Sequence, residues 1–110
     1  MQQLQPTQAV ALCAAKGNAP LLLDVREDWE VAVAAIRIDG VAASHIPMGR
    51  IPERLAELDP EQPVVCICHH GMRSAQVAHF LERQGFATVY NLAGGIDAWS
   101  EQVDATVPRY

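Results

Sequence analysis

The chain has 110 residues, of which 50% are hydrophobic and 19% are charged, and its formal net charge at pH 7 is -5. This length fits one domain, residues 1–110, and the acidic balance argues against a general nucleic-acid binder, because neutralising phosphates requires a basic surface. No apolar run approaches the roughly 20 residues of a membrane helix, and the odd count of three cysteines indicates reduced thiols rather than a disulfide framework, so we expect a cytoplasmic protein with no membrane partner.

Helical and strand patterns alternate through the first half of the chain. Residues 8–16 are rich in alanine and predict a helix that Thr7 caps and Gly17-Asn18 ends. A continuously apolar run over residues 21–25 predicts a buried strand. The further elements expected in this half are a helix over residues 27–35, a short strand over 36–41 and a helical segment over 51–58.

The same alternation continues in the second half. A second apolar run, residues 64–68, predicts another strand buried on both faces, and an apolar stripe predicts a helix that begins near Arg73 or Ser74 and ends at Gly85. Such doubly buried strands are typical of a parallel sheet covered by helices. We therefore predict an α/β domain with a mainly parallel sheet and right-handed crossovers. The last expected elements are a strand over residues 88–91 and a helix over 96–103.

Cys68 stands where a predicted strand ends and a helix begins about six residues later. In parallel α/β sheets, ligands gather beyond the carboxyl ends of the strands, and the N-terminus of the next helix offers unpaired N–H groups with partial positive charge. A short loop can also turn successive amides inward to form an anion-binding nest. A cysteine in such a nest favours the thiolate, which attacks sulfur or phosphorus electrophiles.

Four motifs in series resemble the rhodanese family. They are CHHGMRS at residues 68–74, LLLDVRE at 21–27, HIPMG at 45–49 and VYNLAGGIDAW at 89–99. The resemblance implies a rhodanese-like fold, with about five strands in a mainly parallel sheet flanked by helices on both faces. It also implies a sulfurtransferase that carries sulfur as a persulfide on Cys68. The sulfur would come from thiosulfate or a persulfide donor and pass to cyanide or a thiol acceptor, including protein thiols.

The loop residues 69–74, which include Met72, form the expected binding site around that sulfur. Their amides would stabilise the persulfide and the leaving group without a side-chain base. Gly71 permits backbone angles closed to other residues and is the natural pivot. Arg73 would either hold the sulfonate end of thiosulfate or brace the loop against a nearby carboxylate, and Ser74 would cap the helix or donate to the sulfur.

Two pairs of residues, one inside this loop and one outside it, need separate interpretation. His69 and His70 depart from the commoner loop of the family, and as mostly neutral groups they give a weaker positive field than arginine, which leaves the donor open. Asp24 and Arg26 match the family's DVR segment. We expect them to form an ion pair or loop brace, with direct substrate contact as the alternative.

Several other functions compete with sulfur transfer as interpretations of this sequence. Cysteine-dependent phosphatases and arsenate reductases are disfavoured, because a phosphatase loop is one residue longer and has arginine where Ser74 stands. Cys66, Cys68 and the paired histidines lack the spacing of a closed zinc site, so we expect no metal. Gly94-Gly95 lacks a nucleotide fingerprint, and we expect no cofactor. The alternative from another class is a non-catalytic interaction or sensing module on the same fold.

Overall fold

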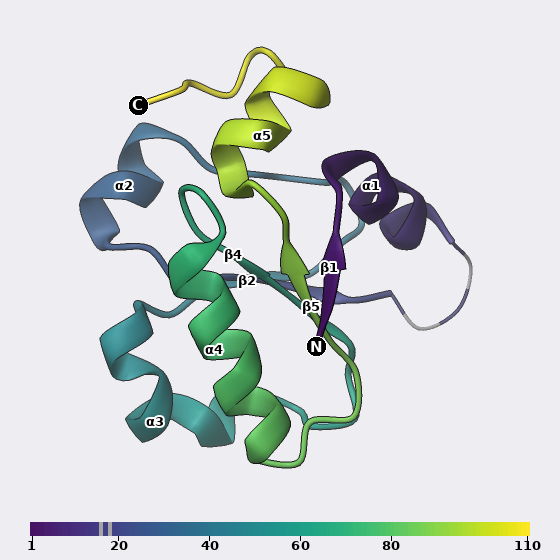
Figure 1. Cartoon of the computed structure of the whole chain (residues 1–110), viewed down its shortest axis with the longest axis vertical. Helices are drawn as coiled ribbons and strands as arrows, with labels where there is room; N and C mark the ends of the chain where they lie inside the picture. The colour runs from purple at the N-terminus through teal and green to yellow at the C-terminus, as the bar shows by residue number, and fades with distance from the viewer. Residues whose placement is uncertain (16, 18) are drawn as a thin grey trace.

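A parallel sheet forms the centre of the computed structural model, which describes residues 1–15, 17 and 19–110 (Figure 1). The described residues form five strands in the order β1-β5-β4-β2-β3, and every neighbouring pair is parallel. The short strand at the centre, β4, lies between β2 and β5, with Cys66 paired to Leu23 on one side and to Asn91 on the other. The strands are β1 (Gln2–Leu4), β2 (Leu21–Asp24), β3 (Ala43–His45), β4 (Val64–Ile67) and β5 (Val89–Leu92).

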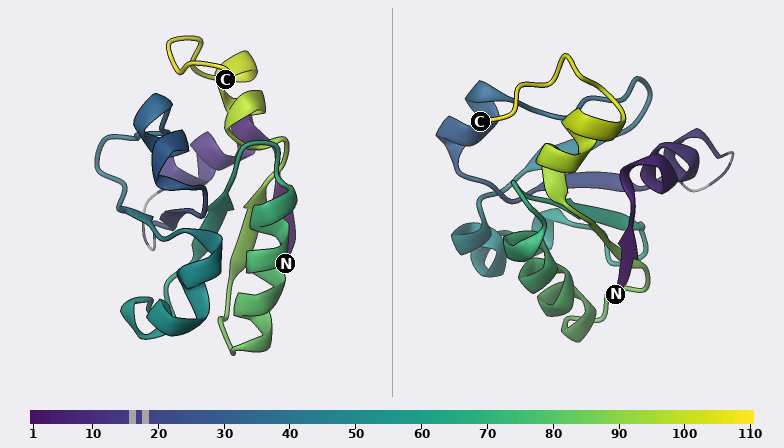
Figure 2. Two further views of the ribbon diagram at one scale, coloured as in Figure 1. Left: turned by 90° about the vertical axis from the view of Figure 1, so that its left-hand side faces the viewer. Right: turned by 45° about the horizontal axis from the view of Figure 1, so that its top comes forward.

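Helices cover both faces of this sheet (Figures 1 and 2). The helical elements are α1 (Pro6–Ala14), α2 (Asp28–Val33), η1 (Met48–Arg50), α3 (Ile51–Arg54), η2 (Leu55–Glu57), α4 (Met72–Arg83) and α5 (Gly95–Gln102). Successive side chains of a strand point to opposite faces. Cys66 of β4 accordingly packs in one core with residues of α3 and α4, and Val65 in the other with residues of α1 and α5. This two-sided burial explains the continuously apolar strands and confirms the predicted α/β class.

Two strand predictions need correction. The predicted strand over residues 36–41 is wrong, because the third strand is β3, Ala43–His45, which pairs with β2 after a turn at Gly40. Ile36 is apolar because it packs in the core and not because it belongs to the sheet. Strand β1 was missed, since it holds two exposed glutamines and a single buried leucine and carries no apolar run.

The first helix also differs from its prediction. Helix α1 begins at Pro6 and has Gln5 at its N-cap, so Thr7 lies inside the first turn and the predicted cap is wrong. Proline is well suited to the first helical position because its φ is already helical and its missing N–H would have no partner there. Helix α1 ends at Ala14 with Ala15 at its C-cap, and Lys16 and Asn18 of the predicted end lie outside the described residues.

The carboxyl ends of β2, β4 and β5 meet at one edge of the sheet, where the chain turns into the segments before α2, α4 and α5. Cys68 directly follows β4 at this edge. The fold therefore brings the ends of three strands to the candidate cysteine. In the described part of the chain, no helix combines the length and the apolar character that crossing a bilayer requires.

Candidate active site

Cys68 lies beneath a closely fitted loop and is only 1% exposed. Its Sγ accepts a hydrogen bond from the backbone N–H of Gly71 at 3.1 Å, and the hydroxyl oxygen of Ser74 lies 3.2 Å away. Gly71 has a φ of 97°, and a Cβ there would lie 3.2 Å from the backbone oxygen of Leu92 and nitrogen of Gly94. Only glycine meets both demands without strain. The turn at Gly71 thus aims an amide at the sulfur.

Ser74 connects the sulfur to a buried asparagine. Helix α4 has Gly71 at its N-cap, so the predicted capping role of Ser74 is wrong, and its hydroxyl instead lies between Cys68 Sγ and Asn91 Oδ1. Asn91 is 1% exposed and donates from Nδ2 to the Gly71 carbonyl and to Gln3 Oε1, each at 3.0 Å. This amide therefore holds both the Ser74 hydroxyl and the pivot of the loop.

Our sequence reasoning did not identify Asn91 as a site residue. A signal was present, because an asparagine inside a buried apolar strand must find hydrogen-bond partners in the interior. Its partners, however, come from the first turn of α4, from Gly71 just before it and from β1, which lie far from it in sequence. The sequence therefore indicates that Asn91 needs hydrogen-bond partners, but it does not indicate which residues they are.

The start of α5 holds the loop from the other side. Ile96 and Asp97 donate their backbone N–H groups to the carbonyls of Cys68 and His69, at 2.9 Å and 3.1 Å. A Cβ on Gly95 would lie 2.4 Å from both carbonyl oxygens, so this close approach requires glycine. The glycine pair at the start of α5, Gly94 and Gly95, is therefore a docking point for the cysteine loop.

Arg73 is held by a buried carboxylate on α2. Its Nη1 and Nη2 donate to Glu30 Oε1 and Oε2 at 2.7 Å and 2.9 Å, and the Glu30 side chain is only 5% exposed. The hydrogen bonds from Arg73 lower the pKa of Glu30 to about 2, and the same pair raises the pKa of Arg73. Of the two roles considered for Arg73, this two-pronged geometry favours the brace. Glu30 was not identified from the sequence, where it is one acidic residue among several on a helix.

Asp24 and Arg26 form a second buried ion pair beside the first. Arg26 is fully buried and donates from Nη2 to Asp24 Oδ2 at 2.7 Å and to the carbonyl of Ala34 at 2.6 Å. Because a charged group without solvent needs all its donors paired, these contacts fix Arg26 in place. Its arrangement supports the bracing role and leaves the guanidinium no face for a substrate.

His69 and His70 stack on each other at the mouth of the loop. Their ring centroids lie 3.9 Å apart, with an angle of 21° between the planes. Together with Asp97 they form a group whose metal-binding atoms all lie within 4.8 Å of one another, which the sequence spacing did not predict. Arg109 donates to both oxygens of Asp97, at 2.9 Å and 3.2 Å. The only carboxylate of this group is therefore already paired with a cation.

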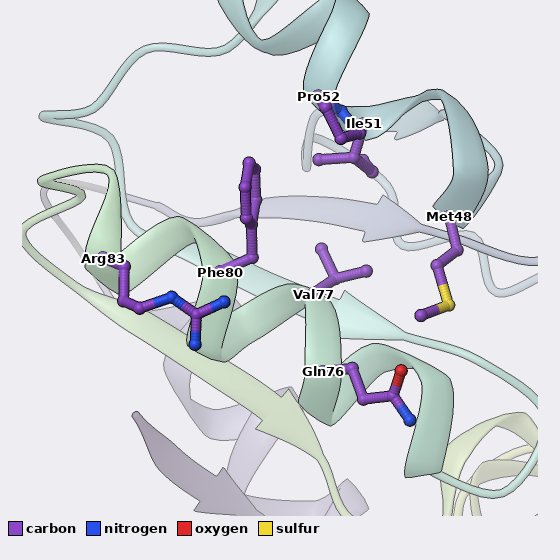
Figure 3. A pocket seen from close by; sticks show the side chains of 7 residues that line it. All are labelled: Met48, Ile51, Pro52, Gln76, Val77, Phe80 and Arg83. Carbon is purple, nitrogen blue, oxygen red and sulfur yellow. The ribbon is translucent and has the colours of Figure 1, made fainter.

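Cys66 and an apolar pocket beside α4 lie apart from this chemistry. Burial raises the pKa of the Cys66 thiol to about 12, so it stays protonated at neutral pH. Figure 3 shows a pocket between the segment from η1 to α3 and helix α4. It is lined by Met48, Ile51, Pro52, Gln76, Val77, Phe80 and Arg83. These lining residues all lie outside the loop 68–74, so the pocket is separate from the loop that surrounds Cys68.

Comparison with known proteins assigns the fold to a family. The model of the rhodanese-like domain matches residues 6–102. The chain belongs to the rhodanese family. The YtwF protein of Bacillus subtilis (strain 168) is 50% identical to this rhodanese domain over 78 residues, which are 71% of each chain. The thiosulfate sulfurtransferase GlpE of Actinobacillus pleuropneumoniae serotype 3 is 36% identical over 97 residues, covering 88% of this chain and 84% of GlpE.

A solved structure supports the same assignment. A rhodanese-like domain protein from Staphylococcus aureus superposes with a TM-score of 0.80 at 27% identity, covering 100% of this chain and 99% of its own. The rhodanese fold expected from the four motifs is thus confirmed over nearly the whole chain. These likenesses place sulfur transfer first among the activities to be considered for Cys68.

Proposed function

We propose that this rhodanese domain is a sulfurtransferase that carries sulfane sulfur as a persulfide on Cys68. The observation that carries the proposal is the position of Cys68 Sγ, which accepts the Gly71 N–H at 3.1 Å beside the Ser74 hydroxyl at 3.2 Å. Donors aimed at a sulfur atom stabilise negative charge on it, both in the thiolate and in the persulfide. Thiosulfate or a persulfide is the proposed donor, and cyanide or a thiol, including a protein thiol, is the proposed acceptor.

The proposed reaction has two nucleophilic steps. The Cys68 thiolate attacks the outer sulfur of thiosulfate, a new S–S bond forms at the protein, and the old S–S bond breaks so that sulfite leaves with the electron pair. Cyanide then attacks the terminal sulfur, the persulfide S–S bond breaks, and thiocyanate leaves while the thiolate returns. Because no proton is consumed in either step, the Gly71 amide and the Ser74 hydroxyl are sufficient support and no dedicated base is needed.

The surroundings of the loop favour this reaction over phosphate chemistry. A phosphatase uses its loop arginine to clamp a phosphate dianion, whereas Arg73 is occupied by Glu30 through two hydrogen bonds. The cradle presents the Gly71 amide to the sulfur, and the Ser74 hydroxyl beside it shares its proton between the sulfur and Asn91 Oδ1. These donors suit one sulfur atom better than a phosphate group with several oxygens.

Intact mass spectrometry tests the proposal directly. After incubation with thiosulfate, we expect the protein to gain the mass of one sulfur, and cyanide should remove it again. Cys68→Ser should gain nothing, whereas Cys66→Ser should gain sulfur like the wild type, because Cys66 is fully buried and its thiol stays protonated. No gain in a wild-type protein whose Cys68 still reacts with iodoacetamide would leave the non-catalytic interaction or sensing module as the better interpretation.

A further inference from the structure

The chain after α5 returns to the cysteine loop and places Tyr110 beside it. Figure 1 and the right-hand view of Figure 2 show the C-terminal segment ending next to α2. Tyr110 is half-buried there and contacts residues of α2, of the segment before α2 and of the loop after β4. None of the motifs used in the sequence analysis includes this residue.

The hydroxyl of Tyr110 joins the two ion pairs that brace the loop. It donates to Glu30 Oε2 at 2.7 Å and accepts from Arg26 Nη1 at 2.8 Å. Glu30 in turn holds Arg73 of the loop. Burial and the bond to Glu30 raise the pKa of Tyr110 to about 12, so the phenol keeps its proton at neutral pH and remains a donor. The Asp24–Arg26 and Glu30–Arg73 pairs thereby form one connected network.

The ring of Tyr110 covers the first residue of the loop. It stacks on His69 with the centroids 4.0 Å apart and the planes at 10°, and it meets Trp29 edge-on at 5.9 Å. Within the described chain, Nε2 of His69 is buried and has no hydrogen-bond partner. The His69 imidazole stacks on Tyr110 and on His70. These stacking contacts therefore hold the ring, and no hydrogen bond through Nε2 contributes.

We propose that Tyr110 is a positioning residue for Cys68, whose hydroxyl couples Glu30 to Arg26 and whose ring holds His69 at the mouth of the loop. The expected effect of Tyr110 on reaction rate rests on the proposed sulfur transfer. The loop is clamped at both ends by these contacts, at His69 by the ring and at Arg73 by the carboxylate that the hydroxyl supports. A reacting sulfur displaced by a fraction of an ångström loses alignment with its donors, so the clamp acts on the rate of sulfur uptake.

Two substitutions separate the hydroxyl from the ring. Tyr110→Phe keeps the stack and removes the hydrogen bonds to Glu30 and from Arg26, and we expect kcat/KM for thiosulfate to fall by about threefold. Tyr110→Leu removes both, and we expect a fall of about tenfold or more, expressed mainly in kcat because loop alignment matters most in the transition state. Thr106→Ala, an exposed change in the same segment, should match the wild type. All variants are to be assayed below their melting temperatures.

Peptide-resolved alkylation of Cys68 by iodoacetamide gives a second readout that needs no sulfur chemistry. A loop freed from its clamp should let Cys68 react about tenfold faster in Tyr110→Leu, with Tyr110→Phe close to the wild type. If wild-type protein takes up no sulfur, the proposed function fails and this alkylation still decides the role of Tyr110. Wild-type kcat/KM together with a wild-type alkylation rate in Tyr110→Leu would overturn the inference.

If Tyr110→Leu fails to fold, the hydroxyl is tested through a double mutant. In a Glu30→Gln background, where the carboxylate is gone, Tyr110→Phe should cost far less than the expected threefold, because the two groups act through one hydrogen bond. An equal loss in both backgrounds would mean that the hydroxyl does not act through Glu30, and the proposed coupling would be rejected.

Discussion

Gly71 is the residue on which the geometry around Cys68 depends most directly. Its positive φ turns its own N–H toward the sulfur, and its carbonyl accepts from Asn91 behind the loop. A side chain there would strain the backbone and press on two backbone atoms of the segment before α5 at 3.2 Å. The space between the loop after β4 and the chain after β5 therefore admits only glycine at position 71 without strain.

We expect Gly71→Ala to lower the rate of persulfide formation by more than about tenfold, because the amide donor moves away from the sulfur. The matched control is Gly85→Ala. Gly85 has a similar φ of 92°, and no atom of the described residues lies within 4 Å of its Cβ position, at the far end of α4. Gly85→Ala should lower the free energy of unfolding by about 1–2 kcal/mol. Gly71→Ala should lower it by at least as much because of the two close backbone contacts, and only this change should slow sulfur uptake. Equal rates in the two variants would contradict the cradle.

At the scale of elements, α2 contributes to the site through one side chain. Glu30 is the buried residue of this short helix, and it receives hydrogen bonds from Arg73 and from Tyr110. Helix α2 is otherwise polar or exposed along most of its length, with Trp29 63% exposed. Its place against the cysteine loop therefore depends on a charged contact, which makes that contact sensitive to pH.

Glu30 should make stability fall in acid. Its pKa is lowered from 4.5 to about 2, first by the hydrogen bonds from Arg73. A depressed folded-state pKa stabilises the native state above pH 4.5, and this contribution, of the order of 3 kcal/mol, is lost as the pH falls toward 2. Urea unfolding of the wild type should follow this loss, and Glu30→Gln should lack it. Glu53→Gln, whose carboxylate is 60% exposed, should behave like the wild type, and identical pH profiles for Glu30→Gln and wild type would refute the assignment.

At the scale of the whole molecule, two apolar cores share one sheet. Cys66 belongs to the core beneath α3 and α4, and Trp99 to the core beneath α1 and α5. Alternate residues of the same short strand, β4, enter both cores. Loss of either core would unpair the strand that supports the other, so we expect residues 1–110 to behave as a single domain.

Cooperative unfolding is the corresponding prediction. In a Trp29→Phe background, fluorescence reports Trp99 alone, because the chain has 2 tryptophans. The urea midpoint of this fluorescence should coincide with that for labelling of Cys66, since each residue is buried in a different core. Separate midpoints would mean that the two faces unfold independently.

The sequence by itself determined the fold class and the position of Cys68. Continuous apolar runs report burial on both faces of a strand, and a cysteine between such a strand and a helix lies at the ligand-binding edge of a parallel sheet. Such patterns are local, so they can be read along the chain. The same reasoning misplaced the third strand and missed β1, because three-residue strands with exposed side chains have no apolar pattern to detect.

Only the tertiary structure decided which partners surround the cysteine. The placement of α2 paired Arg73 with Glu30, the order of strands put Asn91 behind Ser74, and the return of the chain after α5 laid Tyr110 on His69. Each of these partners is separated from the loop by at least 17 positions in the chain. A hydrogen bond depends on the distance and direction between two groups in space. The number of residues between two groups determines neither of these until the order of the strands is known.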